Sequence, residues 1–399
     1  MELAEIRLFE PQMAEIDLFT MPDAVGVGEP SVRKVKPYIS GHINDGSSTF
    51  TFKVNGNDVT VSVSGGDWKY KPTAAITSLA FVSVPQLESL ELNKITGVST
   101  FNLDYPVVPV FKKCDATTEA ALNYVYHIRG TATDDFDFTL KYIDDNNTVT
   151  TVTENAVIDG NGKWDVSYSG KKIYDMTDTF ASNTIVESIE LTEAMKENIS
   201  MSGTFNMCKN LEYFLSKNAT WDKTNNINRL FRRCYSIKNI DFGKNPTFKC
   251  IGFSQLGAYQ MFYDCNELIS IDGLGGATFE ESATFYMMFN NCKKLTTLQL
   301  HSINISNSEQ SSQMFSSCNS LSELYIPQDS SNELSQDLRW SPLTYDSMLR
   351  VAGWLKDLSG GTAQTVTFKA DTYNALTAEQ KAELEGIIVT QKGWILATA

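Results

Sequence analysis

Five copies of one seven-residue phrase constrain the fold of this chain more than any other feature of its sequence. The copies FNMCKNL, FRRCYSI, FYDCNEL, FNNCKKL and FSSCNSL begin at residues 205, 231, 262, 289 and 315. Each has Phe first, Cys fourth and Leu or Ile seventh, and successive cysteines lie 26, 31, 27 and 26 residues apart. A period of this length predicts a repeat protein in which each unit stacks on the next.

The apolar residues of each copy indicate how one repeat would fold. Steps of three residues suit a helical or 3₁₀ turn, and a following step of two, as from Leu298 to Leu300, suits a short strand. One unit cannot bury its own apolar face, so neighbours are expected to share a core. The predicted repeat core comprises Phe205, Cys208, Leu211, Phe231, Cys234, Ile237, Phe262, Cys265, Leu268, Phe289, Cys292, Leu295, Phe315, Cys318 and Leu321.

The repeat cysteines are interpreted as small buried apolar residues. Fainter copies of the phrase begin at Phe81 and Phe180, and there Val84 and Asn183 occupy the cysteine position. A reactive thiol would be missing from those copies. The chain has seven cysteines and its first residues do not resemble an export signal, so reduced thiols are expected instead of a disulfide framework. Stacking would bring equivalent cysteines near disulfide distance, which leaves sporadic oxidation open.

The phrases MFYDCNELISI and MMFNNCKKLTTLQL resemble those of BspA-type leucine-rich repeats. Such repeats occur in surface proteins of gut bacteria and protists, and in virion proteins of phages that infect such bacteria. The similarity is clear over residues 176 to 330. The resemblance implies a right-handed leucine-rich-repeat solenoid and a role in adhesion or assembly, and it implies no catalytic residue.

Two longer segments, 38–70 and 126–170, resemble each other and predict a duplicated β module. Apolar residues alternate in both, and both end in Gly, any residue and Trp, at Trp68 and Trp164. The NGND stretch at 55–58 predicts a hairpin turn. The last 59 residues predict a helix after Thr344, a strand, a helix opened by a capping box from Thr377 to Gln380, and a final strand.

The expected fold class is therefore an α+β repeat protein, a leucine-rich-repeat solenoid with two small β modules, an extended N-terminal arm and an α/β C-terminal cap. The predicted divisions are an anchoring arm and linker (1–36), a first β module with a short repeat segment (37–115), a second β module (116–172), the solenoid (173–340) and the cap (341–399).

The N-terminal arm contains two similar segments, AEIRLF at 4–9 and AEIDLF at 14–19. Apolar residues alternate with charged ones, which suits short strands that add to the sheet of a larger partner. A terminal strand folded back on its own β module is the alternative. The predicted anchoring residues are Ile6, Leu8, Phe9, Ile16, Leu18 and Phe19.

Residue types suited to catalysis are sparse. The three histidines, His42, His127 and His301, lie far apart and outside any catalytic or phosphate-binding motif, so neither an enzyme nor a cofactor is expected. Oxygen-rich stretches could bind calcium, but tight turns favour the same residue types. These stretches hold Asp134, Asp135, Asp137, the DDNN at 144–147, Asp159, Asn161 and Asp165. Turn chemistry is the preferred interpretation, and no metal site is predicted.

A net charge of -15 disfavours nucleic-acid binding, and no apolar run is long enough to span a membrane. The sequence predicts a non-enzymatic structural protein of a phage virion, a fibre, head or tail component. Its arm would bind other virion proteins, and its repeats would bind a protein or a host-surface glycan. Tyrosines near the repeats, including Tyr213 and Tyr263, are candidates for such contacts or for scattered surface positions. A homo-oligomer is compatible with this role, and a bacterial cell-surface adhesin is the alternative.

Overall fold

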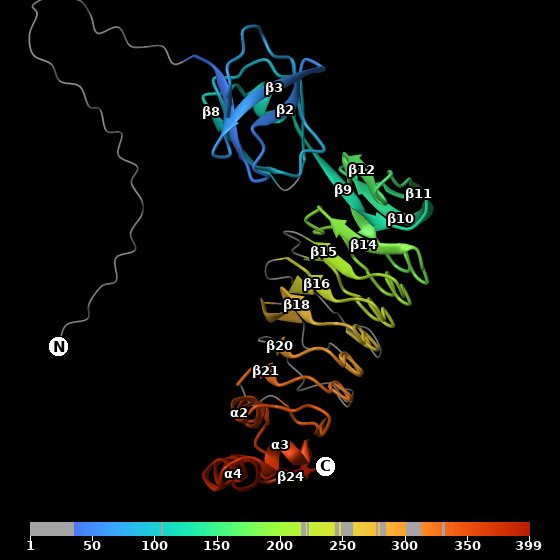
Figure 1. Cartoon of the computed structure of the whole chain (residues 1–399), viewed down its shortest axis with the longest axis vertical. Helices are drawn as coiled ribbons and strands as arrows, with labels where there is room; N and C mark the ends of the chain where they lie inside the picture. Colours follow the sequence, from blue (N-terminus) through green and yellow to red (C-terminus); the bar gives the residue numbers. More distant parts are fainter. Residues whose placement is uncertain are drawn as a thin grey trace, which may run out of the picture. The chain divides into compact units, whose positions relative to one another are not determined.

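The computed structural model describes residues 36–104, 107–216, 221, 223–243, 247–248, 258–276, 278–279, 285–300, 313–328 and 332–399 (Figure 1). Residues 37–399 form one compact unit. The anchoring residues predicted between Ile6 and Phe19 lie outside the described residues, so the arm stays a prediction, as do the divisions proposed within 37–399.

The first β module is built from eight strands and contains the predicted hairpin. Val54 pairs with Asn57 across the turn, and Asn55 and Gly56 both have positive φ, 51° and 77°, as a two-residue hairpin turn requires. The strands are β1 (Tyr38–Ile43), β2 (Thr49–Val54), β3 (Asn57–Ser64), β4 (Asp67–Tyr70), β5 (Ser78–Phe81), β6 (Leu87–Asn93), β7 (Thr100–Asp104) and β8 (Pro109–Lys112).

The second β module repeats the packing of the first. Trp68 lies 4.9 and 5.3 Å, between ring centroids, from a pair of phenylalanines on β2, and Trp164 lies 5.1 and 5.9 Å from the equivalent pair on β10. The elements are α1 (Ala116–Ala120), β9 (Leu122–Ala132), β10 (Phe136–Asp144), β11 (Val149–Ala156), β12 (Lys163–Ser169) and, extending past the predicted boundary at residue 172, β13 (Lys171–Asp175) and β14 (Val186–Leu191).

Strand β9 belongs to both modules (Figure 1). Its first residues, from Leu122 to Val125, pair in parallel with β7 of the first module. Its remainder pairs antiparallel with β12 on one side and with β14 on the other. Side chains from the two modules therefore meet where β9 passes from one to the other.

The five repeat phrases form stacked coils beyond β14 (Figure 1). Each coil contributes a short strand, and β14, β15 (Tyr213–Ser216), β16 (Asn239–Asp241) and β18 (Ser270–Asp272) pair in parallel. Strand β20 (Thr297–Gln299) pairs in parallel with β21 (Glu323–Tyr325). The intervening elements are β17 (Thr247–Phe248), which pairs with β19 (Thr278–Phe279), and the 3₁₀ turn η1 (Leu274–Gly276).

All fifteen residues of the predicted repeat core are buried. The repeat phenylalanines continue a stack that begins at Phe180, with neighbouring centroids 5.1–6.1 Å apart and ring planes within 13°. Each repeat cysteine donates its S–H to the carbonyl of the phenylalanine one coil earlier, over 2.9–3.2 Å. The described cysteines are all free thiols. The thiol is thus a small core group with one hydrogen bond.

The expected fold class, an α+β leucine-rich-repeat solenoid, is wrong. The described residues form mostly β structure, in which a mixed 14-stranded sheet runs through both modules and the coils as far as β18. The three-residue steps do not form helical turns. The residue before each repeat cysteine has φ of 61–67°, and the residue two before each repeat phenylalanine has φ of 51–62°. Left-handed residues at both places interrupt helical hydrogen bonding, so the phrase folds as consecutive tight turns.

The C-terminal part covers the last coil with short helices and a three-stranded parallel sheet. Thr344 caps α2 by accepting from the Ser347 backbone N–H, and the predicted capping box from Thr377 to Gln380 opens α4. The elements are β22 (Gln336–Leu338), α2 (Tyr345–Trp354), β23 (Thr365–Phe368), α3 (Ala370–Asn374), α4 (Ala378–Glu385), the π-helix η2 (Gly386–Gln391) and β24 (Ile395–Thr398).

Candidate functional site

A groove of about 800 Å³ lies over the strands β12, β9, β14 and β15. Pro85 of the first module forms part of its wall, and Val157 and Asp159 from the connection between β11 and β12 form another part. Tyr213 on β15 and Val157 are both exposed large apolar side chains, with 46% and 60% of their surface accessible. Exposed apolar surface in a concave site of this size is typical of a ligand site.

An ion pair forms part of the groove lining. Arg129 on β9 donates from Nε and Nη2 to the two carboxylate oxygens of Glu190 on β14, over 3.1 and 2.9 Å. These residues are direct partners in the sheet register. Burial disfavours the charged form of Arg129, but the pair with Glu190 outweighs it and raises the arginine pKa. Arg129 is therefore held charged, and the two side chains form a planar arrangement suited to polar ligands.

Two hydroxyl groups and a glycine complete the groove. The Oγ atoms of Thr131 and Ser188 lie 2.9 Å apart, and Ser188 Oγ also accepts from the Thr131 backbone N–H. Gly130 lies so close to β14 that an added Cβ would be 1.8 Å from the carbonyl oxygen of Ser188. The glycine is required because the register of β14 shifts between Val186 and Ser188, which brings the two backbones together.

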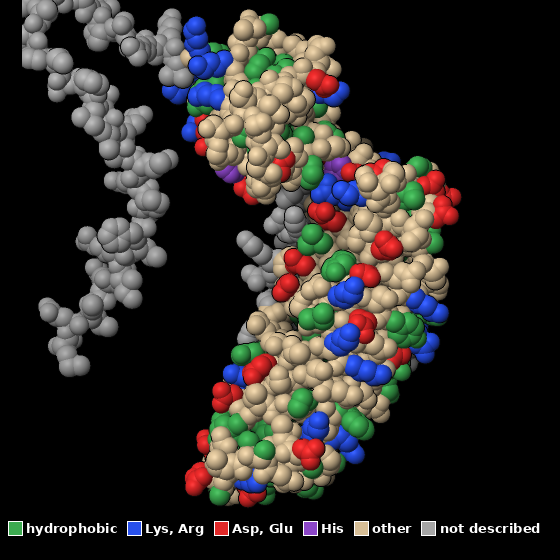
Figure 2. All heavy atoms as spheres, viewed as in Figure 1, with side chains coloured by type: hydrophobic (Ala, Val, Ile, Leu, Met, Phe, Trp, Pro, Cys, Tyr) green, Lys and Arg blue, Asp and Glu red, His purple; other side chains and the backbone are tan. Residues whose placement is uncertain are grey.

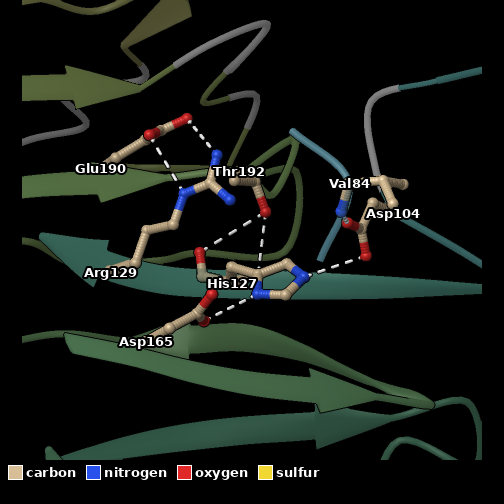
Figure 3. A network of polar contacts seen from close by, with 7 residues as sticks. All are labelled: Val84, Asp104, His127, Arg129, Asp165, Glu190 and Thr192. Carbon is tan, nitrogen blue, oxygen red and sulfur yellow. Dashed lines mark hydrogen bonds and ion pairs between the residues drawn. The ribbon is translucent and has the colours of Figure 1, made fainter. Parts of the chain in front are cut away.

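A buried polar network lies beside the groove, on the same stretch of β9 (Figure 3). The side chain of His127 is 1% exposed. Its Nδ1 lies 2.7 Å from Asp165 Oδ1, and its Nε2 lies 3.1 Å from Asp104 Oδ1. Asp104 ends β7 of the first module, whereas Asp165 belongs to β12 of the second. The imidazole therefore joins the two modules through one carboxylate from each.

The carboxylates hold this imidazole in its charged form. Burial alone would lower the pKa of His127, but hydrogen bonds and charge interactions with Asp104 and Asp165 outweigh that effect and raise it to about 9. Asp104 is also oriented by the Val84 backbone N–H, which donates to its Oδ2 over 3.0 Å. Because carboxylates occupy both ring nitrogens, His127 is placed to connect the modules and not to accept a proton from a ligand.

The oxygen-rich stretches considered for calcium are engaged in turns. Asp159 Oδ1 accepts from the backbone N–H groups of Asn161 and Lys163, and Asp144 Oδ1 accepts from those of Asn146 and Thr148. These backbone bonds lower the pKa of Asp159. Among the described residues, no three or more His, Cys, Asp or Glu side chains gather as metal ligands would.

Sequence reasoning found parts of this site but not their proximity. Tyr213, a predicted contact residue, lines the groove, and Asp165, considered as a calcium ligand, lies 2.7 Å from His127 Nδ1. His42 contacts Asp67 at 2.8 Å on the surface, and His301 lies outside the described residues. Arg129 and Glu190 were missed. The duplication of the β module was the one sequence signal for this part of β9. Gly41 in the first module and Gly130 in the second occupy equivalent positions, opposite Trp68 and Trp164, and Arg129 is next to Gly130.

Comparison with protein-family models, with curated proteins and with solved structures finds no match to this chain. The resemblance of the repeat phrase to BspA-type repeats therefore stays a prediction. Among the described residues, no helix has both the length and the apolar character needed to cross a membrane.

Proposed function

We propose that this protein is a non-enzymatic structural protein of a phage virion that binds a partner, a protein or a glycan of the host surface. The groove over β9, β12, β14 and β15 is the observation that carries the proposal. It combines the exposed ring of Tyr213, the fixed pair of Arg129 and Glu190, and the hydroxyl groups of Thr131 and Ser188.

These groups suit recognition of a polar ligand. An exposed aromatic ring contributes contact area, a bidentate ion pair offers donors and acceptors in a fixed geometry, and hydroxyls add adaptable hydrogen bonds. Paired strands hold all of them, so little conformational entropy is lost on binding. The stacked coils attach directly to this sheet, because β14 and β15 contribute to both the groove and the stack.

Binding to the host surface can be tested with the groove variants. The full chain, immobilised, is exposed to solubilised envelope fractions of candidate host bacteria. Tyr213→Ala and Arg129→Gln are expected to lower retention of envelope material at least fivefold. Trp340→Ala removes an equally exposed aromatic, 48% accessible, far along the chain, and is the matched control. Equal retention by all three variants would refute the groove as the contact site.

The virion assignment has its own test. Peptide mass spectrometry of purified particles is expected to detect this chain at a fixed copy ratio to the major capsid protein. Deleting residues 1–20 is expected to leave a folded protein that no longer joins the particle. If an antibody against the protein labels bacterial cells in an uninfected culture and does not label phage particles, the result would instead support a bacterial cell-surface adhesin.

A further inference from the structure

Cationic and aromatic side chains meet on the tight turns of the coils. We define the turn edge as the residues from three before to two after each repeat phenylalanine. The second, third and fourth coils contribute to this edge the residues Arg229, Arg232, Tyr259, Tyr263 and Tyr286. Lys and Arg side chains recur over the coils on the face drawn in Figure 2. Arg229 is exposed, and the other four residues are half-buried.

The rings and guanidinium groups of the turn edge form a ladder from coil to coil. Arg229 lies over the ring of Tyr259, 5.6 Å from its centroid, and Tyr259 stacks on Tyr286 with centroids 5.6 Å apart and planes at 18°. Arg232 lies over Tyr263 at 5.7 Å. Tyr259 and Tyr286 each precede their repeat phenylalanine by three residues, so stacking of the coils brings them together.

The positive charge on this edge is incompletely neutralised. Arg233 Nε lies 3.7 Å from Asp264 Oδ2. Arg232 instead donates to the neutral Gln260 Oε1 over 3.0 Å, and within the described residues neither Arg229 nor Arg232 has a carboxylate at ion-pair distance. Burial is the largest cause that lowers the pKa of Arg232, and crowding by the like charges of Arg233 and Arg229 lowers it further. Such crowding, in a chain of net charge -15, favours an anionic ligand.

We propose that the turn edge around Arg229, Arg232 and Tyr259 binds an acidic polysaccharide. Guanidinium groups bind carboxylate or sulfate groups through paired hydrogen bonds, and half-exposed tyrosine rings pack against the apolar faces of sugars. The inference rests on the proposed function as a host-contacting protein, and it names the chemical class of one partner. The site is separate from the groove, since none of its residues lines that groove.

A sparsely charged polysaccharide fits this edge better than a nucleic acid. Nucleic-acid binding needs many cations along the backbone, whereas this ladder supplies two arginines without a carboxylate partner among the described residues. The overall negative charge repels a densely charged strand more than a polymer with spaced charges.

The experiment measures binding of the full chain to hyaluronan, which carries one carboxylate for every two sugars, to uncharged dextran of the same length and to a single-stranded DNA of twenty nucleotides, at low and physiological salt. The wild type is expected to bind hyaluronan only. The double variant Arg229→Gln, Arg232→Gln is expected to bind at least tenfold more weakly. Tyr259→Ala is expected to weaken binding about fivefold and Tyr259→Phe to retain it. The double variant Lys53→Gln, Lys71→Gln removes the same charge from the first module and should bind as the wild type does.

Three results would overturn the proposal: equal loss in both double variants, equal binding of dextran, or tighter binding of DNA. Circular dichroism melting establishes that each variant is folded before its binding is compared. Virion mass spectrometry is independent of this measurement, so failure of the polysaccharide site and failure of the virion assignment are distinguishable.

Discussion

Replacing His127 with Gln should destabilise the protein in a pH-dependent way. In the folded protein the pKa of His127 is about 9, against 6.5 for an unperturbed histidine, because Asp104 and Asp165 hold the imidazolium. This pKa difference of about 2.5 corresponds to a stabilisation of the folded protein by about 3 kcal/mol, because each tenfold change in proton affinity is worth about 1.4 kcal/mol. Since the folded pKa is raised, this stabilisation is complete below pH 6.5 and is lost as the pH rises through 9.

Urea denaturation of the wild type and the His127→Gln variant, followed by circular dichroism at pH 6, 7.5 and 10, checks this expectation. The difference in free energy of unfolding between the two proteins should be about 3 kcal/mol larger at pH 6 than at pH 10. Comparing differences matters because the buried Glu193, whose pKa burial raises to about 8, also makes stability depend on pH. Its effect is common to both proteins and cancels.

His42→Gln is the matched control. His42 also contacts a carboxylate, Asp67 at 2.8 Å, but its side chain is 39% exposed, so the expected change is below about 1 kcal/mol at every pH. Nuclear magnetic resonance titration of the imidazole signals measures the pKa of His127 directly. A value near 6.5, or a stability difference between wild type and His127→Gln that is constant with pH, would refute the reasoning.

Three further predictions concern the packing. Gly130→Ala should lower the free energy of unfolding by about 3 kcal/mol, because its Cβ would collide with the Ser188 carbonyl. Gly160→Ala, where an added Cβ meets nothing within 4 Å, should change it by less than about 0.5 kcal/mol in the same urea titration. Phe262→Ala should lower the free energy of unfolding by about 3–5 kcal/mol and Phe262→Leu by clearly less, since the ring stacks on the phenylalanines of both neighbouring coils. Similar losses of stability in the two variants would argue against ring stacking. In native protein treated with iodoacetamide, peptide mass spectrometry should find Cys114, which is partly exposed, modified before any of the five buried repeat cysteines. Burial raises the pKa of Cys208 and Cys318 to about 12, so early modification of these thiols would contradict their place in the core.

Local patterns in the sequence predicted local structure well. Asn55 and Gly56 adopt the positive φ that their hairpin needs, and Thr377 forms its capping box, because each depends on residues a few positions away. The step of three residues in the repeat phrase predicts a helical or 3₁₀ turn, whereas the phrase folds as consecutive tight turns. Spacing alone does not distinguish such a turn from consecutive tight turns, and in none of the five copies is the left-handed residue before the cysteine a glycine.

The candidate site was harder to predict because its parts are distant in sequence. Arg129 and Glu190 are 61 residues apart, and they meet only because β9 pairs with β14. Asp104 follows Phe101 by three residues, the same step that separates the phenylalanine and cysteine of each repeat phrase, and nothing in its own surroundings indicates a buried histidine partner. The tyrosines of the turn edge, Tyr259 included, become a ladder only when the coils are stacked.

The sequence by itself determined which side chains are buried in each coil, since a period of 26 to 31 residues returns Phe, Cys and Leu or Ile to the same inward position. Only the tertiary structure decided that both modules and the coils as far as β18 share one mixed sheet, and that β9 carries His127 between a carboxylate from each module. The physical reason is that burial in each coil follows from apolar residues that repeat locally. Pairing between strands that are far apart in sequence depends instead on how whole segments pack together, and the sequence of one segment does not indicate which other segment it pairs with.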